Sequence, residues 1–505
     1  MFHTGHKVPI SLLVLLVLPL ALIAQNKAEV KIVQADSWKN NQNIIKNANR
    51  LLGDVIIDHA DIRMWCDSAY MYSDTNIVDA FGHVHILKAD TLNMYARYIR
   101  YNGDTKWALA TGNVKLVNKT VTLTTDTLNY DMNQGIGYYD DYGTVQDSTN
   151  TLHSRIGEYY TRLDRVYFKT EVDVTTDSYQ MISDTLVYQP KTGITSIVGP
   201  TTIFNEKDTL IATAGFYNTQ SGDAELHQFP VIKTEGRNIT ASSIYYNKQS
   251  GDGLAIGQAS IHDVANQVII KGNRIAYNDI KKESLVNDSA LALFYTAKDT
   301  LFMHADTLKT VADTIPNENI VQAYFNVKFF RNDLQGKCDS LVYYTKDSTL
   351  CLFNDPVLWS GDNQMTSDYM EMVRKDSINQ EFEMKQNAFI IAREDTVRYN
   401  QIKGRNMKGY ITRNDLYRID VDGNGQSVYY AKDDKGLIGL NKAQASTIQI
   451  RLQESKVTRI SFFTTPDGQL VPLADISELD KLLPGFNWRE DIRPKSFNDI
   501  FIKEK

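Results

Sequence analysis

The stretch ATGNVKLVNKTVTLTTDTLNYD, residues 110–131, decides the fold of this chain. Polar and apolar residues alternate at 113–116 and again at 126–130, and a period of two places successive side chains on opposite faces of a β-strand. Gly112 precedes the first run, and a glycine inside a strand pattern marks a bend or a close approach of another backbone. The stretch therefore predicts a bent strand followed by a second strand, each with one apolar face.

The same pattern recurs along the chain at a nearly constant spacing. Strand-like segments end in a tyrosine at steps of 29, 29, 30, 28, 29, 29 and 31 residues, obtained by subtracting successive positions. A cluster rich in Asn, Asp and Gly follows most of these tyrosines, and these residue types reverse a strand. The tyrosines are Tyr72, Tyr101, Tyr130, Tyr160, Tyr188, Tyr217, Tyr246 and Tyr277.

A repeat of this length sets the architecture. One unit cannot bury its own apolar face, so units must stack on their neighbours. Composition agrees, because the chain has 28 Tyr and only 11 Pro: tyrosine suits a half-buried pleated surface, and scarce proline leaves backbone groups free for strand pairing. We expect an elongated all-β roll built from repeats of about 29 residues.

The repeat divides the chain into expected parts. Residues 25–280 hold the regular repeat, and residues 281–430 carry the same strand patterns at looser spacing, as a continuation or a second roll with insertions. Residues 431–505 are expected to add the last strands and a capping helix.

The end of the chain carries a helix signal. Asp475 and Glu478 have the spacing of a capping pair and predict a short helix to Leu483, before Pro484 and Gly485. The segment after it should pack onto the body, because four aromatic side chains need cover. They are Phe486, Trp488, Phe497 and Phe501.

Residues 1–24 have the layout of a secretory signal peptide. His6 and Lys7 precede an apolar run that ends at Ala24. Cleavage there is favoured over retention as a membrane anchor, because Pro9 and Pro19 weaken the run as a permanent span. The mature chain is therefore expected outside the cytoplasm.

Charge and cysteine content narrow the possibilities further. The net charge is −7, from 54 basic and 61 acidic residues, so no cation excess favours a nucleic-acid partner. The three cysteines, Cys66, Cys338 and Cys351, are too few for a disulfide framework. Cys338 and Cys351 fit either a bridge between strands or two unpaired buried thiols.

Motifs for catalysis and metal binding are weak. The chain has no HExxH, paired CxxC, GxSxG or Walker loop. His83 and His85 lack a third ligand nearby, and DVDGNGQ at 420–426 has Ala431 where a calcium loop carries a bidentate glutamate. The aspartates of the repeated DTL motif fit strand ends better than one catalytic pair. We expect no enzyme, no metal and no cofactor.

The quoted stretch also carries a resemblance. ATGNVKL followed by VTLTTDTLNYD resembles the OstA-like (LptA-type) repeat of lipopolysaccharide-transport proteins, well over about residues 54–280 and more loosely over 297–372. The resemblance implies a twisted, open β-jellyroll (a β-taco) whose two sheets form an apolar groove for lipid A acyl chains. It also implies a bridge in the periplasm, either free or associated with the outer membrane. Its partners would be lipopolysaccharide or a related glycolipid and transport proteins at both membranes.

The repeat itself suggests where such a groove would lie. A roll with an inward face of Val, Leu, Ile and Tyr can shield alkyl chains without any reaction. The candidate lining residues are Ile86, Val114, Leu116, Leu128 and Leu186. For any one of them a place in a closed core is an equal alternative. Unpaired strand edges at the roll ends predict end-to-end self-association or strand addition by partners.

Two rival functions accompany the carrier hypothesis. The first is a secreted β-solenoid scaffold or adhesin with a filled core. The second is a polysaccharide-active β-helix, which would need clustered acids on one face. Lipid binding by the mature protein separates the carrier from the filled scaffold. Activity on glycans that survives mutation of every Asp in the DTL motifs would eliminate the acid-pair version of the enzyme.

Overall fold

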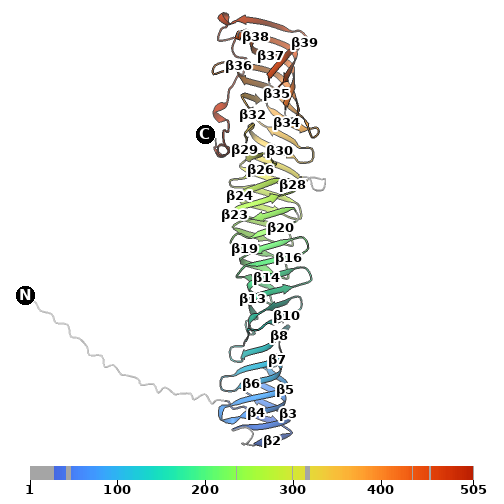
Figure 1. Ribbon diagram of the computed structural model, residues 1–505, viewed down its shortest axis with the longest axis vertical. Coiled ribbons are helices and arrows are strands. Elements are labelled where there is room, and N and C mark those ends of the chain that lie inside the picture. The colour runs from blue at the N-terminus through green and yellow to red at the C-terminus, as the bar shows by residue number, and fades with distance from the viewer. Residues whose placement is uncertain are drawn as a thin grey trace, which may run out of the picture. The chain divides into compact units, whose positions relative to one another are not determined.

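The structure is a computed structural model that describes residues 28–40, 47–234, 236–297, 299–312, 319–413, 415–434, 436–453 and 456–503. It has two compact units, Met1–Asp141 and Tyr142–Lys505, and both are built almost entirely from antiparallel strands (Figure 1). The all-β prediction is therefore confirmed. The expected signal peptide, residues 1–24, lies outside the described residues. No helix among the described residues is long and apolar enough to cross a membrane.

The elements of unit 1 alternate with short turns. They are β1 (Lys31–Gln34), β2 (Ser37–Asn40), β3 (Asn49–His59), β4 (Ile62–Tyr72), η1 (Ser73–Thr75), β5 (Ile77–Lys88), β6 (Leu92–Asn102), β7 (Trp107–Asn118), β8 (Val121–Asp131) and β9 (Ile136–Tyr139).

Unit 2 continues the same kind of meander over more strands. Its first elements are β10 (Gly143–Gln146), β11 (Thr151–Ser154), β12 (Ile156–Tyr160), β13 (Arg165–Thr175), β14 (Gln180–Gln189), β15 (Ile194–Ile197), β16 (Thr201–Phe204), β17 (Thr209–Ala212), β18 (Ala214–Asn218), β19 (Ala224–His227), β20 (Val231–Thr234), β21 (Arg237–Thr240), β22 (Ser243–Tyr246), β23 (Asp252–Asp263), β24 (Val268–Asn278), β25 (Glu283–Asn287) and β26 (Leu291–Tyr295). They are followed by β27 (Thr300–His304), β28 (Thr307–Ala312), β29 (Asn319–Arg331), β30 (Leu334–Tyr344), β31 (Thr349–Phe353), β32 (Val357–Ser360), β33 (Asn363–Thr366), β34 (Tyr369–Arg374), β35 (Asn379–Arg393), β36 (Tyr399–Thr412), β37 (Asp415–Asp433), β38 (Gly436–Gln453), β39 (Lys456–Phe463), β40 (Asp467–Pro472), η2 (Leu473–Asp475), η3 (Glu490–Ile492) and η4 (Phe497–Phe501).

The long strands bend at a corner, as the glycine in the repeat predicts. In β7 the pairing register with β8 shifts between Thr111 and Val114, and Gly112 has a φ of 80°. A bulge of this kind adds a residue to one strand and turns it sharply. Each long strand is thereby divided between two layers that meet at the corner, and the apolar faces of the two layers face each other.

The corners of unit 2 continue far beyond the regular repeat. Each consists of two neighbouring residues with positive φ, and from residue 288 onward the steps between corners are 37, 29, 32, 37 and 41 residues by subtraction. The looser spacing therefore reflects longer strands and turns around the same corner. The pairs are Thr170–Glu171, Gln228–Phe229, Gly257–Gln258, Asp288–Ser289, Phe325–Asn326, Asn354–Asp355, Gln386–Asn387, Gly423–Asn424 and Thr464–Thr465. The positions expected as boundaries, 280 and 430, both lie inside unit 2.

The repeat tyrosines of unit 2 form one register row with small residues between them. Tyr188 lies opposite Thr195, Thr195 opposite Tyr217, and Tyr217 opposite Ala224. The row continues through Tyr246 to Gly253 and Tyr277. An added Cβ on Gly253 would lie 1.9 Å from the Tyr277 ring. Large and small side chains therefore alternate so that the rings fill the interior.

Two of the quoted tyrosines are exceptions. Tyr159, and not Tyr160, lies in the register row of Tyr188, through Val166. In unit 1, Met71, and not Tyr72, lies in the row of Tyr101, through Val78. The sequence pattern located the strand end correctly but took the neighbouring tyrosine as its inward residue in the fourth repeat.

The end of the chain forms a strap, defined here as residues 473–503, on the outer face of unit 2. The helix expected from Asp475 to Leu483 is wrong: only Leu473–Asp475 forms a 3-10 turn, and residues 476–483 are turns and irregular backbone. The reason is that the backbone bonds to the sheet instead of to itself. Gln401 of β36 donates to the carbonyl of Lys481 at 2.7 Å and accepts from the N–H of Leu483 at 2.8 Å.

The strap packs against the outer face of unit 2, as expected from its aromatic residues. Phe486 and Trp488 contact the Tyr399 ring at 5.2 and 5.3 Å. The Phe497 ring lies 4.8 Å from that of Phe302. The strap therefore runs beside the strands from β36 to β27 (Figure 1).

Candidate functional site

The interior of unit 2 is lined by two long rows of apolar side chains, one in each layer. The first row follows the register from strand to strand without a polar member. It consists of Gly157, Phe168, Leu186, Ile197, Gly215, Leu226, Ile244, Ala255, Ile275, Val286, Leu308, Ala323, Leu341, Leu352, Met370, Met384, Met407, Val421, Ile448 and Phe462.

The second row lies in the other layer and is equally apolar. It consists of Val145, Leu152, Val174, Met181, Ile203, Leu210, Ile232, Ile239, Ile261, Ile270, Ala292, Met303, Phe329, Gly336, Leu358, Met365, Ile390 and Ile402. Members of both rows belong to one continuous core cluster. The period-two alternation of the sequence is thus converted into a continuous hydrocarbon-like interior.

Turns border this interior on the side opposite the corners. Successive bent strands of unit 2 are joined by turns that alternate between two rows, because each strand runs from one side of the roll to the other. The first turn row includes residues 147–150, 176–179, 205–208, 264–267 and 332–333. The second includes 161–164, 190–193, 219–223, 247–251, 279–282 and 345–348.

Between the two turn rows, burial changes along unit 2. Inward side chains of the first strands, such as Phe168, Met181 and Leu186, are 0% exposed. From Leu210 and Tyr217 onward, many inward side chains beside both turn rows keep partial exposure. A subset of them packs against the core cluster that begins at Ile239. Its members are Ile232, Tyr246, Ile261, Phe294, Leu301, Leu334, Tyr343, Leu350, Met365, Ile402, Ile411, Leu416, Leu452, Ile460 and Phe462. We call this set the apolar mouth.

The five residues expected from the sequence all lie in the interior but outside the apolar mouth. Ile86 and Leu116 belong to one inner row of unit 1 and Leu128 to the other, while Val114 follows the corner at Gly112. Leu186 belongs to the first inner row of unit 2. Each of the five is at most 1% exposed.

Sequence reasoning missed the residues of the mouth. Alternation shows which face of a strand points inward, but it does not show how completely the opposite layer covers that face. The available signal was the loosened spacing after Tyr277, where bulky inward residues such as Phe294 and Tyr343 appear.

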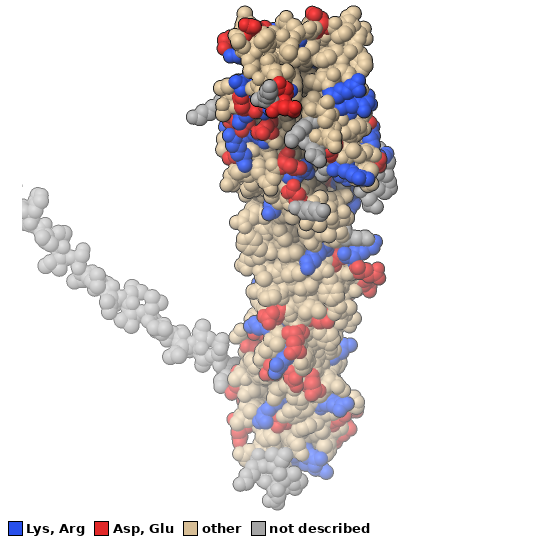
Figure 2. Space-filling view, turned by 45° about the horizontal axis from the view of Figure 1, so that its top comes forward, with Lys and Arg blue, Asp and Glu red and all other residues tan. Residues whose placement is uncertain are grey.

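The outer face of unit 2 is polar and carries both signs of charge, which are interspersed on the face drawn in Figure 2. Lys408 lies 3.0 Å from Glu381 and 3.1 Å from Glu383. Hydrogen bonds from Lys408 lower the pKa of both carboxyls, and the same bonds raise the pKa of Lys408. Paired charges of this kind keep the face soluble without an excess of one sign.

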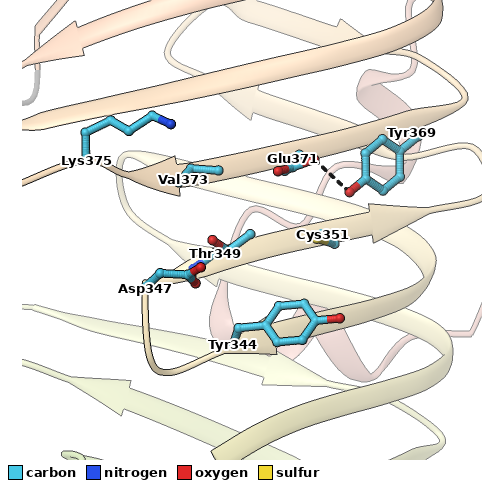
Figure 3. A pocket seen from close by; sticks show the side chains of 8 residues that line it. All are labelled: Tyr344, Asp347, Thr349, Cys351, Tyr369, Glu371, Val373 and Lys375. Atoms are coloured by element: carbon cyan, nitrogen blue, oxygen red, sulfur yellow. Dashed lines mark hydrogen bonds between the residues drawn. The ribbon is translucent and has the colours of Figure 1, made fainter. Parts of the chain in front are cut away.

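A pocket of about 400 Å³ opens on this outer face between β30, β31 and β34 (Figure 3). Tyr369 donates a hydrogen bond to Glu371 at 3.0 Å across its wall. Cys351 lies beside them, and burial raises the pKa of its thiol, so the sulfur remains a thiol at neutral pH. All three cysteines are free and buried, which settles the open alternative for Cys338 and Cys351 in favour of unpaired thiols.

The structure shows where the weak histidine and calcium-loop motifs of the sequence lie. His83 is paired with Asp67 at 3.0 Å on the surface, and His85 stacks between Trp65 and Tyr95. The DVDGNGQ segment contains the corner at Gly423–Asn424 in β37. Among the described residues, no group of three or more His, Cys, Asp or Glu side chains is placed to hold a metal ion.

Comparison with known proteins gives one match. The family model described as OstA-like protein matches residues 27–184, which include most of unit 1 and the first strands of unit 2. No curated protein matches the chain.

Proposed function

From the premise that residues 27–184 belong to the OstA-like family, we propose that this chain is a periplasmic, non-catalytic carrier. It shields the acyl chains of lipopolysaccharide or a related glycolipid on their way to the outer membrane. The apolar mouth of unit 2 carries this proposal, because it exposes hydrocarbon-like side chains beside both turn rows of a continuous apolar interior.

Burial energy is sufficient for such a role. Each methylene removed from water contributes about 0.8 kcal/mol, so a chain of roughly twelve methylenes gains on the order of 10 kcal/mol before the cost of ordering it. No polar anchor is required for the acyl part. The sugars remain in water outside the mouth, beside the polar turns.

Strand edges supply the proposed contacts with partners. β39 and β40 both pair with β38 at the end of unit 2, and β1 and β2 both pair with β3 in unit 1. These last strands offer an edge for strand addition. The partners proposed are transport proteins at the inner and outer membranes, or a second copy of this chain.

A second candidate is a secreted β-solenoid scaffold or adhesin with a filled core. The complete burial of residues such as Phe168 and Leu186 favours it, because a filled interior leaves no room for a ligand. The two candidates differ in whether hydrocarbon enters the mouth.

Titration of the purified mature protein with cis-parinaric acid, a fluorescent fatty acid, tests this difference. The carrier should bind the probe, and Ile402→Asp should weaken binding by at least about tenfold, because the substitution places a charge against the alkyl chain. Ile211→Asp is the matched control, since Ile211 is 37% exposed and its strand neighbours Leu210 and Ala212 take the inward positions. Absence of probe binding by the wild-type protein would favour the filled scaffold.

A further inference from the structure

A buried polar cluster spans the interior of unit 2 shortly before the apolar mouth begins. Asn150, in the turn at 147–150, is 3% exposed. Its side-chain amide donates to the hydroxyl of Tyr188 at 2.7 Å and to that of Thr219 at 3.4 Å. Tyr188 in turn donates to the carboxylate of Asp147.

This cluster joins the two turn rows. Asp147 and Asn150 belong to the first turn row, whereas Tyr188 ends β14 beside the second row and Thr219 lies in a turn of that row. The next turns are joined by an aromatic contact, because the rings of Tyr179 and Tyr217 lie 5.3 Å apart and edge to face. The two turn rows are therefore held together across the opening.

The contacts coincide with the change in burial. Interior side chains level with the cluster, such as Leu152 and Leu186, are 0% exposed, and partial exposure of inward side chains beside the turns begins with Leu210 and Tyr217.

The apolar composition of the two inner rows does not change between these regions. The kind of contact across the opening does change. Hydrogen bonds join Asn150 to Tyr188 and Thr219, whereas within the mouth the rings of Phe294 and Tyr343 lie 5.7 Å apart.

We propose that the Asn150–Tyr188 cluster is a closure that sets one end of the hydrocarbon path. Acyl chains occupy the interior from the apolar mouth onward and reach the level of Leu186 only when the cluster separates. This inference rests on the proposed carrier function and assigns a specificity role to residues that touch no lipid themselves. Separation removes the hydrogen bond that joins the buried amide of Asn150 to the buried hydroxyl of Tyr188, which keeps the closed state favoured.

Photo-crosslinking tests the closure. Photo-leucine replaces leucine in the protein, and the probe is an alkyne-tagged C16 fatty acid. Crosslinked leucines are located by mass spectrometry. The wild-type protein should label at the mouth, at Leu334 and Leu350, and not at Leu152 or Leu186. Asn150→Ala removes the hydrogen bonds to Tyr188 and Thr219 and should raise labelling at Leu186 by at least roughly tenfold, the effect of losing buried hydrogen bonds on an opening equilibrium.

Two further variants keep the test decisive. Asn205→Ala is the matched control, because Asn205 accepts hydrogen bonds from Lys207 and Asp208 within its own turn and should leave the labelling pattern unchanged. Tyr188→Phe keeps the ring and removes the hydroxyl, so it replaces Asn150→Ala if that variant unfolds.

The outcomes separate the two proposals. Two results would overturn the closure but not the carrier function. The first is labelling at Leu186 in the wild-type protein. The second is labelling confined to the mouth in both Asn150→Ala and Tyr188→Phe. Labelling at none of the leucines overturns the carrier itself.

Discussion

The strap is attached to unit 2 through a buried glutamine, and removing that side chain gives a sharp test. Gln364 of β33 is 0% exposed. Its amide donates to the carbonyl of Asn487 at 2.7 Å, and its oxygen accepts from the N–H of Arg489 at 2.7 Å. The substitution Gln364→Ala removes both hydrogen bonds without touching the core between the layers.

The magnitude follows from these two bonds. Each contributes a net of about 1 kcal/mol, and each backbone group left unpaired in a buried place costs about 1–3 kcal/mol. The strap can shift to admit water, which lowers the second cost. We therefore expect strap docking to weaken by about 2–3 kcal/mol, which is roughly 30- to 150-fold in the opening equilibrium.

Hydrogen exchange measured by mass spectrometry on peptides from residues 486–503 reads this equilibrium directly. Exchange there should accelerate by the stated factor, while exchange in β13 and β14 stays unchanged. Gln444→Ala is the control, because Gln444 bonds at 3.4 Å to Asp467, outside the strap. Acceleration below about threefold in Gln364→Ala would show that the remaining contacts, such as those of Gln335 with Arg493, hold the strap without Gln364. The magnitude assigned to the two Gln364 hydrogen bonds would then be refuted.

Three other outcomes are expected. Gly409→Ala should lower the free energy of unfolding, measured in urea, by about 1–3 kcal/mol, because the added Cβ would lie 1.9 Å from the Phe382 ring. A second substitution, Phe382→Leu, should recover part of that loss. Ellman's reagent should find no reactive thiol until the protein unfolds, since all three cysteines are buried and burial raises the pKa of Cys66 to about 12. Hydrogen bonds from Lys442 and Ser477 lower the pKa of Asp480 to about 2. The contribution of Asp480 to strap docking is therefore present above about pH 4 and is lost as the pH falls towards 2. Asp480→Asn should remove this pH dependence of hydrogen exchange in the strap.

Much of the fold could be predicted from local pattern. Gly112 marked the corner of β7, and the alternation on either side of it identified which residues point inward. Leu116, Leu128 and Leu186 all lie in inner register rows as a result. These features depend only on the pleat and the bulge, which are local properties of the chain.

Features that depend on distant neighbours could not be predicted. The helix signal at Asp475 failed because Gln401, about eighty positions earlier, takes the backbone groups that a helix would have used. Phe294 and Tyr343 lie beside opposite turn rows of different repeats, and their rings lie 5.7 Å apart while both keep partial exposure. A pattern of period two is the same in a covered and an uncovered interior.

Openness of the roll is therefore determined by polar residues at the rim and not by the apolar residues inside. Leu186 and Leu341 occupy the same register row of unit 2 and are both buried. Beside Leu186, the hydroxyl of Tyr188 is bonded across the opening to Asn150. Beside Leu341, Tyr343 keeps partial exposure. Substituting inner leucines would change how well a lipid packs, whereas substituting the rim would change where a lipid can enter. A carrier and a filled scaffold can thus share one interior sequence, and the side chains at the turns distinguish them.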